Sequence, residues 1–316
     1  MLTPRFFAEY RATPTRWFWG PLAGTLRELM TAVRFQVEVQ GAEHLPPTPA
    51  LLCTNSTHTY DFLALMKGLD QLGRRVVSVT KAKNFHNPAM AFAMKRTGTI
   101  PLASRGYLIM VDFIAVHGRR PDEREYRILR DHLDDGAPLP QGEPYRSVLE
   151  RPRVVHGLPF DGGAPWREVL LDVFRRFAGE SVRLARTAVD AGALVQIYPE
   201  GTVSPRLGTG RGGAVQLAHA LGVPLLPVGM SGCPKAFVAT TPIPAPARVT
   251  IRIGAPLEVA LPDAHSAFEP DDEVRHAGEI ARATARVMGA IDSLLDAEYR
   301  HAPEGAPAGK GLRALL

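Results

Sequence analysis

The sequence has little cysteine and no long apolar run. It contains two cysteines in 316 residues, Cys53 and Cys233, and both lie in or beside apolar, strand-like stretches. Because no cysteine–histidine spacing typical of zinc is present, no metal site is expected, and both cysteines are interpreted as buried free thiols. No stretch reaches the roughly 18 consecutive apolar residues of a membrane-spanning helix, and the N-terminus lacks the apolar core of a signal peptide. We therefore expect a cytoplasmic or peripheral protein rather than an integral one.

Dense tracts of lysine and arginine are also missing. The formal net charge is +5, 22% of the residues are charged and 45% are hydrophobic. This composition is ordinary for a folded protein and argues against global disorder. With no recognised nucleic-acid motif, nucleic acid is not expected as a partner. A mild basic excess instead fits an anionic membrane surface or a phosphate-bearing substrate.

Apolar strand-like stretches alternate with helical ones from about residue 41 onward. Strands are predicted over 50–55, 74–82, 98–103, 193–199, 223–229 and 247–259. Helices are predicted over 58–73, 87–98, 179–192, 214–222 and 271–300. This alternation predicts an α/β domain over 41–300 with three layers, in which helices flank a mixed, largely parallel sheet. Residues 301–316 are rich in Pro, Gly and Ala and are predicted to form a flexible tail.

Two segments depart from this pattern. In residues 1–40, "RFF" at 5–7 and "RWFWG" at 16–20 mix arginine with aromatics, and 21–35 has helical apolar spacing. Aromatics mixed with arginine are typical of interfacial helices, so we predict a membrane-associating segment, with packing against the main domain as the alternative. Residues 107–165 are long, charged and rich in Pro and Gly, as in an insertion that is either a functional lid or disordered.

A histidine and an aspartate stand close together in "LLCTNSTHTYDFLAL", residues 51–65. His58 and Asp61 are three residues apart, so on a helix they would share one face and their side chains could meet. A histidine titrates near neutral pH, and a carboxylate can fix its tautomer, so the pair is suited to general-base catalysis. The alternative is the polar cap of a buried helix.

A glycine-rich loop follows a predicted strand in "IYPEGTVSPRLGTGRGGAVQLAHALG", residues 197–222. Backbone N–H groups before a helix, together with Arg206 and Arg211, would form an anion site. The motif Gly208-x-Gly210-x-x-Gly213 lies too far from the strand and lacks the acidic residue of a dinucleotide fold, and no Lys-Ser/Thr follows the glycines. A plain glycine-rich turn is the remaining alternative.

Several stretches resemble the glycerolipid acyltransferases, typified by 1-acylglycerol-3-phosphate acyltransferase. "YPEGTVS" resembles the Pro-Glu-Gly-Thr block of that family, and "RGGAVQLAHALGVPLLPVG", "GTIPLASRG" and "VTIRIGAPLEV" resemble its neighbouring blocks. The resemblance covers roughly residues 40–105 and 175–260. It implies a glycerol-3-phosphate acyltransferase-like fold and transfer of an acyl group from acyl-CoA or acyl carrier protein to a hydroxyl of a lysophospholipid or glycerol phosphate. It implies no cofactor. The N-terminal aromatics and arginines would hold the enzyme at the anionic inner face of the cell membrane.

The same resemblance implies roles for individual residues. Three residues would shape the acceptor pocket: Glu200, Gly201 and Thr202. Arg105, which ends the second block, would bind the acceptor phosphate, because a guanidinium binds phosphate in a bidentate way. Val203 stands where the family often has an arginine, so one phosphate contact is missing. Either Arg206 or Arg211 replaces it, or the acceptor lacks the usual phosphomonoester.

The first block of the family is His, four residues, Asp. With Asp61 at the Asp position, Ser56 stands at the His position. Three hypotheses remain open. In the first, His58 is the base and Asp61 orients it. In the second, Ser56 marks a catalytically inactive lipid-binding protein, and in the third, Ser56 is a nucleophile activated by His58.

Overall fold

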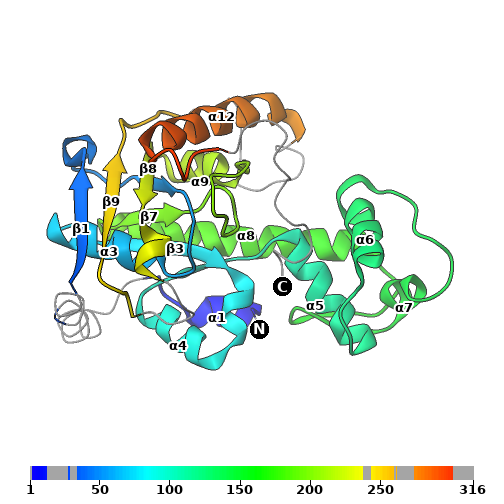
Figure 1. The fold of residues 1–316 in the computed structure, drawn as a ribbon. Coiled ribbons are helices and arrows are strands. Elements are labelled where there is room, and N and C mark those ends of the chain that lie inside the picture. Colours follow the sequence, from blue (N-terminus) through cyan, green and yellow to red (C-terminus); the bar gives the residue numbers. More distant parts are fainter. Residues whose placement is uncertain are drawn as a thin grey trace.

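The computed structural model describes residues 2–12, 28, 34–237, 243–259, 261 and 274–301 (Figure 1). Its α-helices are α1 Pro4–Glu9, α3 Asp61–Gln71, α4 Pro88–Arg96, α5 Arg105–His117, α6 Glu123–Asp135, α7 Tyr145–Glu150, α8 Trp166–Asp190, α9 Gly213–Leu221, α10 Cys233–Ala236 and α12 Ala277–Leu294. Its strands are β1 Phe35–Gln40, β2 Leu51–Thr54, β3 Val76–Lys81, β4 Ile100–Leu102, β5 Arg153–Val155, β6 Leu158–Phe160, β7 Leu194–Ile197, β8 Leu225–Ser231 and β9 Ala247–Ile253. Its 3₁₀ helices are η1 Ala42–His44 and η2 Ala82–His86.

Seven strands of the described residues form one sheet, in the order β1-β9-β8-β2-β7-β3-β4. The five strands from β8 to β4 are parallel to one another. β9 runs antiparallel to β8, and β1 is parallel to β9. The predicted mixed, largely parallel sheet is therefore confirmed. Because parallel strands end on the same side, the carboxyl ends of β2, β3, β4, β7 and β8 meet at one edge of the sheet.

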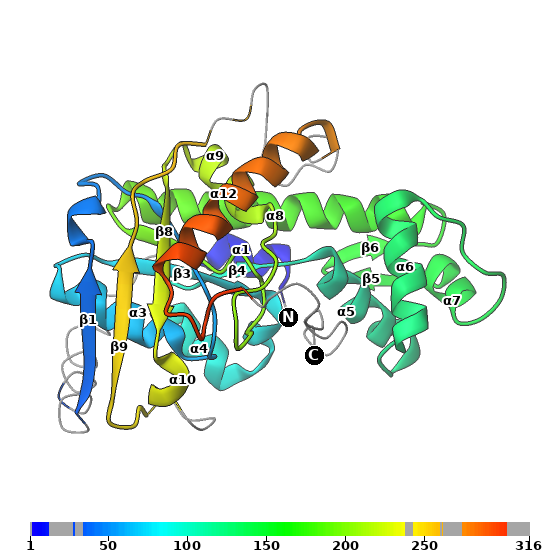
Figure 2. The same cartoon turned by 45° about the horizontal axis from the view of Figure 1, so that its top comes forward.

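Helices cover both faces of the sheet, as the two views show (Figures 1 and 2). α3 packs against β1, β3 and β9 on one face, while α8, α9 and α12 cover the other. Gly68 of α3 allows a close approach, since a Cβ there would lie 2.8 Å from Cδ1 of Ile251 in β9. The predicted three layers are thus present.

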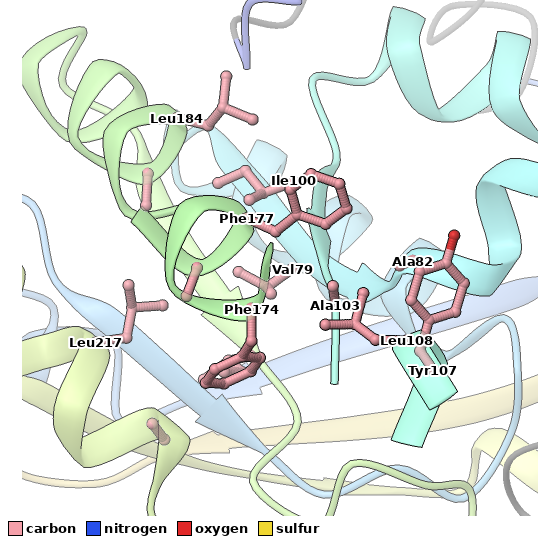
Figure 3. Close-up of a cluster of buried hydrophobic side chains, with 14 of the residues drawn as sticks. Val79, Ala82, Ile100, Ala103, Tyr107, Leu108, Phe174, Phe177, Leu184 and Leu217 are labelled. Carbon is pink, nitrogen blue, oxygen red and sulfur yellow. The ribbon is translucent and has the colours of Figure 1, made fainter. Parts of the chain in front are cut away.

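The larger core lies beneath α8. This helix is long because its apolar residues keep the three- and four-residue spacing of a buried face from Leu170 to Ala188. Figure 3 shows Phe177 of this face near Ile100 of β4, and both residues belong to the larger core. Sequence reasoning predicted only the second half of α8, from residue 179 onward.

The N-terminal helix α1 belongs to this core. Phe7 is 1% exposed, and its ring lies 5.2 Å from that of Phe177. The Tyr10 hydroxyl donates to the carbonyl of Thr99 at 2.7 Å. Phe7 therefore packs against the main domain, which was the alternative to membrane association for the N-terminal aromatics. The "RWFWG" stretch and nearly all of the predicted helix over 21–35 lie outside the described residues.

Residues 107–165 are folded, so the disordered alternative is wrong. They contain most of α5, all of α6 and α7, and the antiparallel pair β5–β6, which form a lobe beside the sheet (Figure 1). A buried network ties this lobe to α8: Asp112 accepts from Arg153 at 2.6 Å and from Nε1 of Trp166 at 2.8 Å. The Pro and Gly residues that suggested an irregular segment separate short regular elements.

Other predicted boundaries need correction. β1 was not predicted, β9 ends at Ile253 rather than 259, and α12 spans Ala277–Leu294 rather than 271–300. His301 is described and forms hydrogen bonds, while the rest of the predicted tail lies outside the described residues. Among the described helices, none combines the length and the hydropathy that crossing a membrane requires.

Candidate functional site

The candidate site lies at the carboxyl edge of the sheet, where β2 and β7 are neighbours. The chain leaves β2 toward α3 on one face, and it leaves β7 toward α9 on the other face. In open α/β sheets, ligands bind outside the carboxyl ends of the strands at such a switch point. The loop after β2 holds Ser56 and His58, and the loop after β7 holds Glu200, so two of the sequence blocks converge here.

Glu200 joins these two loops and the glycine-rich loop. One oxygen of its buried carboxylate accepts from the backbone N–H of Ser56 at 3.0 Å, and the other accepts from the N–H of Gly208 at 2.7 Å. Burial raises the pKa of Glu200, while the two N–H groups oppose that change. The backbone N–H of Ser204 donates to the Ser56 carbonyl at 2.8 Å and completes the connection. The carboxylate therefore fixes the shape of the site.

Asp61 is also buried, and it binds backbone rather than the His58 ring. Its Oδ2 atom accepts from the N–H groups of Thr57 at 2.7 Å and His58 at 2.9 Å. Among the described residues its Oδ1 has no hydrogen-bond partner, although the weakly donating Cys233 thiol lies against the carboxyl group. Burial raises the pKa of Asp61 to about 7, and the Glu200 carboxylate contributes to the shift.

The predicted side-chain pair of His58 and Asp61 is not formed. The helix begins at Asp61, so His58 precedes it and does not share a helical face with it. Nδ1 of His58 instead accepts from the N–H of Tyr60 at 3.2 Å, and the ring stacks on Phe237 with centroids 5.6 Å apart. In the neutral ring this bond assigns the proton to Nε2. Burial lowers the pKa of His58, which favours the neutral ring that a base requires.

Ser56 lies in the loop just after β2. Its residue is 5% exposed, and both of its backbone hydrogen-bonding groups are used by the loop after β7. Within the described residues its hydroxyl makes no hydrogen bond to His58. The nucleophile hypothesis requires that bond, so the arrangement does not favour it.

Four cations gather at the same edge of the sheet. Burial, together with the positive charges of Lys83 and Arg211, lowers the pKa of Lys81, at the end of β3, to about 8. The pKa of Lys83 is lowered by burial and by Arg120 of the lobe. Arg211 lies over Gly201, whose φ of +64° needs a glycine, and a Cβ there would be 3.5 Å from Cδ of Arg211. An anion placed among these cations would be stabilised by all of them.

Sequence reasoning missed the lysines of this cation cluster. The signal is present in "VVSVTKAKN", where Lys81 and Lys83 follow a β-branched strand directly. A cation at the carboxyl end of a parallel strand is a candidate anion ligand. Arg120 has no comparable signal, because only the folding of the lobe brings it close to Lys83.

The predicted phosphate-binding arginines lie in different places. Arg105 begins α5, where it pairs with Asp134 of the lobe at 3.2 Å and lies over the Phe174 ring. Arg206 donates to the backbone carbonyl of Glu298 at 3.2 Å. Of these arginines, Arg211 is the one whose positive charge helps to lower the pKa of Lys81. Thr202 is half-buried in the same loop as Gly201.

Several amides of the glycine-rich loop are not available to the predicted anion site. Four of its N–H groups bind within the protein: Ser204 to Ser56, Leu207 to Tyr299, Gly208 to Glu200 and Arg211 to Pro199. Its glycines serve close packing instead. A Cβ on Gly210 would lie 2.5 Å from Cγ of Met288, and one on Gly212 would lie 2.3 Å from Cγ2 of Ile280, both in α12.

No protein-family model matches this chain, and no curated protein sequence is significantly similar to it. Among solved structures, it is similar to the crystal structure of the 1-acyl-sn-glycerophosphate (LPA) acyltransferase PlsC from Thermotoga maritima. The two are 15% identical, the match covers 84% of this chain and 80% of that one, and the TM-score is 0.39.

Proposed function

We propose that this protein transfers an acyl group from a thioester donor, acyl-CoA or acyl carrier protein, to a hydroxyl of a phosphate-bearing lipid acceptor. The observation that carries the proposal is the hydrogen bond between Glu200 and the N–H of Ser56. It joins two blocks that resemble those of glycerolipid acyltransferases, although they are far apart in the sequence. They meet at the edge where open α/β sheets bind ligands.

The cation cluster supports a phosphate on the acceptor. Lys81 and Arg211 lie at this edge, and their positive charges repel each other. An anion bound between them would be attracted by both charges and would offset this repulsion. A lysophospholipid or glycerol phosphate carries that anion beside a free hydroxyl. Arg105 is less suited to this role, because it is already paired with Asp134.

The chemistry needs one proton acceptor near the acceptor hydroxyl. The hydroxyl oxygen attacks the thioester carbonyl, a base takes its proton, and the thiolate leaves and receives a proton. In this proposal the base is Nδ1 of His58, which must first release the N–H of Tyr60. That bond is long, at 3.2 Å, and is the only hydrogen bond of the ring among the described residues. Asp61 would act by holding the His58 backbone rather than its ring.

A second candidate function is lipid binding without catalysis. It is favoured by Ser56 at the position of the family histidine and by the present engagement of Nδ1 of His58. In this case the cation cluster would still bind a lipid phosphate, but no thioester would be consumed.

The test is acyl transfer by the purified full-length protein. Palmitoyl-CoA and palmitoyl-acyl carrier protein are offered with lysophosphatidic acid, glycerol-3-phosphate or, as the control without phosphate, monoacylglycerol. The proposal expects thiol release that depends on a phosphate-bearing acceptor. Binding of lysophosphatidic acid without any thiol release would support the second candidate.

We further propose that the protein works on an anionic membrane surface at the inner face of the cell membrane. The basic excess and the "RWFWG" stretch support this.

Because α1 packs in the core, deleting 1–40 would damage the fold, so the test replaces Trp17 and Trp19 with serine. Flotation with phosphatidylglycerol vesicles should fall, whereas replacing the 64% exposed Val154 of the lobe should leave it unchanged. Equal flotation of all the variants would refute this anchor.

A further inference from the structure

The loop after β2, which carries Ser56 and His58, is held from both sides. β2 lies between β8 and β7 in the sheet. From the β7 side, the Glu200 carboxylate binds the N–H of Ser56 at 3.0 Å. From the β8 side, the ring of Phe237, which follows α10 directly, stacks on the His58 ring with the two planes 14° apart. The position of the His58 ring therefore depends on α10 as well as on its own loop.

The chain that follows α12 contacts both of these neighbours. We name residues 295–300 the C-terminal turn (red in Figure 2). The carbonyl of its Tyr299 accepts from the backbone N–H of Leu207 at 2.8 Å. Leu207 precedes Gly208, whose N–H binds Glu200 at 2.7 Å. The C-terminal turn thus supports the glycine-rich loop on the β7 side.

The side chain of Tyr299 reaches the β8 side. Its hydroxyl accepts from the backbone N–H of Gly232, which precedes α10, and donates to the Glu298 carboxylate. Glu298 in turn pairs with Lys235 of α10 at 2.8 Å. The carbonyl of Gly232 accepts from the N–H of Lys235 at 3.1 Å and closes the first turn of α10. The hydroxyl therefore binds the residue from which this short helix begins.

Tyr299 is suited to hold α10 in place. The residue is 5% exposed, so packing fixes its ring, and a buried hydroxyl depends on the hydrogen bonds that it makes. α10 has four residues, and Phe237 follows at its end with its N–H bound to the Cys233 carbonyl at 2.8 Å. A displacement at Gly232 is therefore passed along one helical turn to Phe237.

We propose that Tyr299 is a positioning residue of the candidate site: its hydroxyl fixes the start of α10, and thereby the Phe237 ring on which the His58 imidazole stacks. The stack matters because the hydrogen bond from the N–H of Tyr60 to the His58 ring is long, at 3.2 Å, and constrains the ring only loosely. The effect on turnover rests on the proposed function, in which Nδ1 of His58 is the base. The effect on the ring does not, because it depends only on contacts within the protein.

Magnetic resonance of the full-length protein reports on the His58 ring directly. Proton–carbon correlation spectra of the imidazoles are recorded at one alkaline pH, where His58 is neutral, and its signal is assigned by its absence from His58→Gln. A stacked aromatic ring moves such signals upfield. Phe237→Leu removes this contribution and defines the endpoint. In Tyr299→Phe the His58 signal should move toward that endpoint, because the start of α10 has lost its hydroxyl partner.

Tyr10→Phe is the matched control. Tyr10 is also buried, at 7% exposed, and its hydroxyl donates to the carbonyl of Thr99 at 2.7 Å in the larger core. Each variant loses one buried hydroxyl, so both should lower the melting temperature to a similar extent. The His58 signal should stay unchanged in Tyr10→Phe, which separates positioning from a general loss of stability.

Turnover supplies the second readout. With palmitoyl-CoA and lysophosphatidic acid, kcat of Tyr299→Phe should fall about tenfold while both KM values stay unchanged, because a misdirected base affects the chemical step and not substrate binding. Tyr10→Phe should keep the kcat of the unmodified protein.

The proposal is overturned if the His58 signal of Tyr299→Phe coincides with that of the unmodified protein, or if Tyr10→Phe moves it equally. A displaced ring with an unchanged kcat would support the positioning role and refute His58 as the base. A displaced ring in a protein without any thioester turnover would refute the proposed function and leave the positioning role standing.

Discussion

The Asp61 carboxylate binds the backbone N–H of His58 at 2.9 Å, while the imidazole of His58 is directed to the N–H of Tyr60. Asp61 therefore fixes the bend between β2 and α3 and does not fix the tautomer of the ring. The two residues should then have separable effects. Changes at Asp61 should act first on stability, and changes at His58 should act on turnover.

Asp61→Asn should stabilise the protein at alkaline pH. Because the pKa of Asp61 is raised to about 7 from 3.8, the folded state binds its proton more tightly than the unfolded state does. This stabilisation is fully present below about pH 4 and is lost as the pH rises to about 7. Asparagine does not ionise, so the variant does not lose this stability. Its free energy of unfolding should rise by about 2–4 kcal/mol relative to that of the unmodified protein across that window.

Urea unfolding at acidic and alkaline pH measures this gain. Asp70→Asn is the matched control, because Asp70 is exposed on the same helix. A stability difference for Asp61→Asn that stays constant with pH would show that burial does not shift the titration of Asp61.

Glu200→Ala should destabilise the protein by about 2–3 kcal/mol, because it leaves the buried amide of Ser56 and the partly buried amide of Gly208 without their acceptor. Glu200→Gln keeps one acceptor oxygen and should cost less. Glu298→Ala serves as the control, since that side chain is 55% exposed in an ion pair with Lys235. Surface pairs of this kind contribute about 1 kcal/mol or less. Equal denaturant midpoints for Glu200→Ala and Glu298→Ala would contradict a structural role of the two hydrogen bonds that the Glu200 carboxylate accepts.

Lys81→Ala should weaken binding of a phosphate-bearing acceptor. We expect KM for lysophosphatidic acid to rise about tenfold, the size of one lost charge-assisted contact, with little change for monoacylglycerol. Because the pKa of Lys81 is lowered to about 8, the same KM should rise in the unmodified protein above that pH. Arg127→Ala, at a 71% exposed side chain of the lobe, is the control. Equal effects on both acceptors would exclude a phosphate contact at Lys81.

Gly212→Ala should destabilise the protein by about 1–3 kcal/mol, because the new methyl group would press on the stiff side chain of Ile280 in α12. Gly179→Ala, where a Cβ in α8 meets nothing within 4 Å, should instead stabilise by about 0.5–1 kcal/mol. Thermal unfolding compares the two. A neutral Gly212→Ala would show that α12 packing does not require this glycine.

The sequence was sufficient for the alternation of strands and helices, since β2, β3, β7 and β8 are short apolar runs between turn residues. It did not reveal β1, because "FQVEVQ" has charged and amide side chains along an edge strand. The lobe was missed because its Pro and Gly residues separate elements of three to thirteen residues.

The candidate site was predicted only in part. The block around Glu200 was identified, but the role of its carboxylate as a clamp depends on a partner 144 positions away. The spacing argument for His58 and Asp61 assumed that both lie on one helix, and the helix begins at the second of them. The packing of the glycines against α12 could not be predicted, because α12 is distant in the sequence.

The most direct test of the account is thiol release from palmitoyl-CoA in the presence of lysophosphatidic acid. The unmodified protein is compared with His58→Ala and Ser56→Ala. Acyl transfer with His58 as the base predicts acceptor-dependent release that falls about 100-fold or more in His58→Ala and persists in Ser56→Ala. Absence of release from the unmodified protein, with lysophosphatidic acid still bound, would contradict the account and identify a lipid-binding protein.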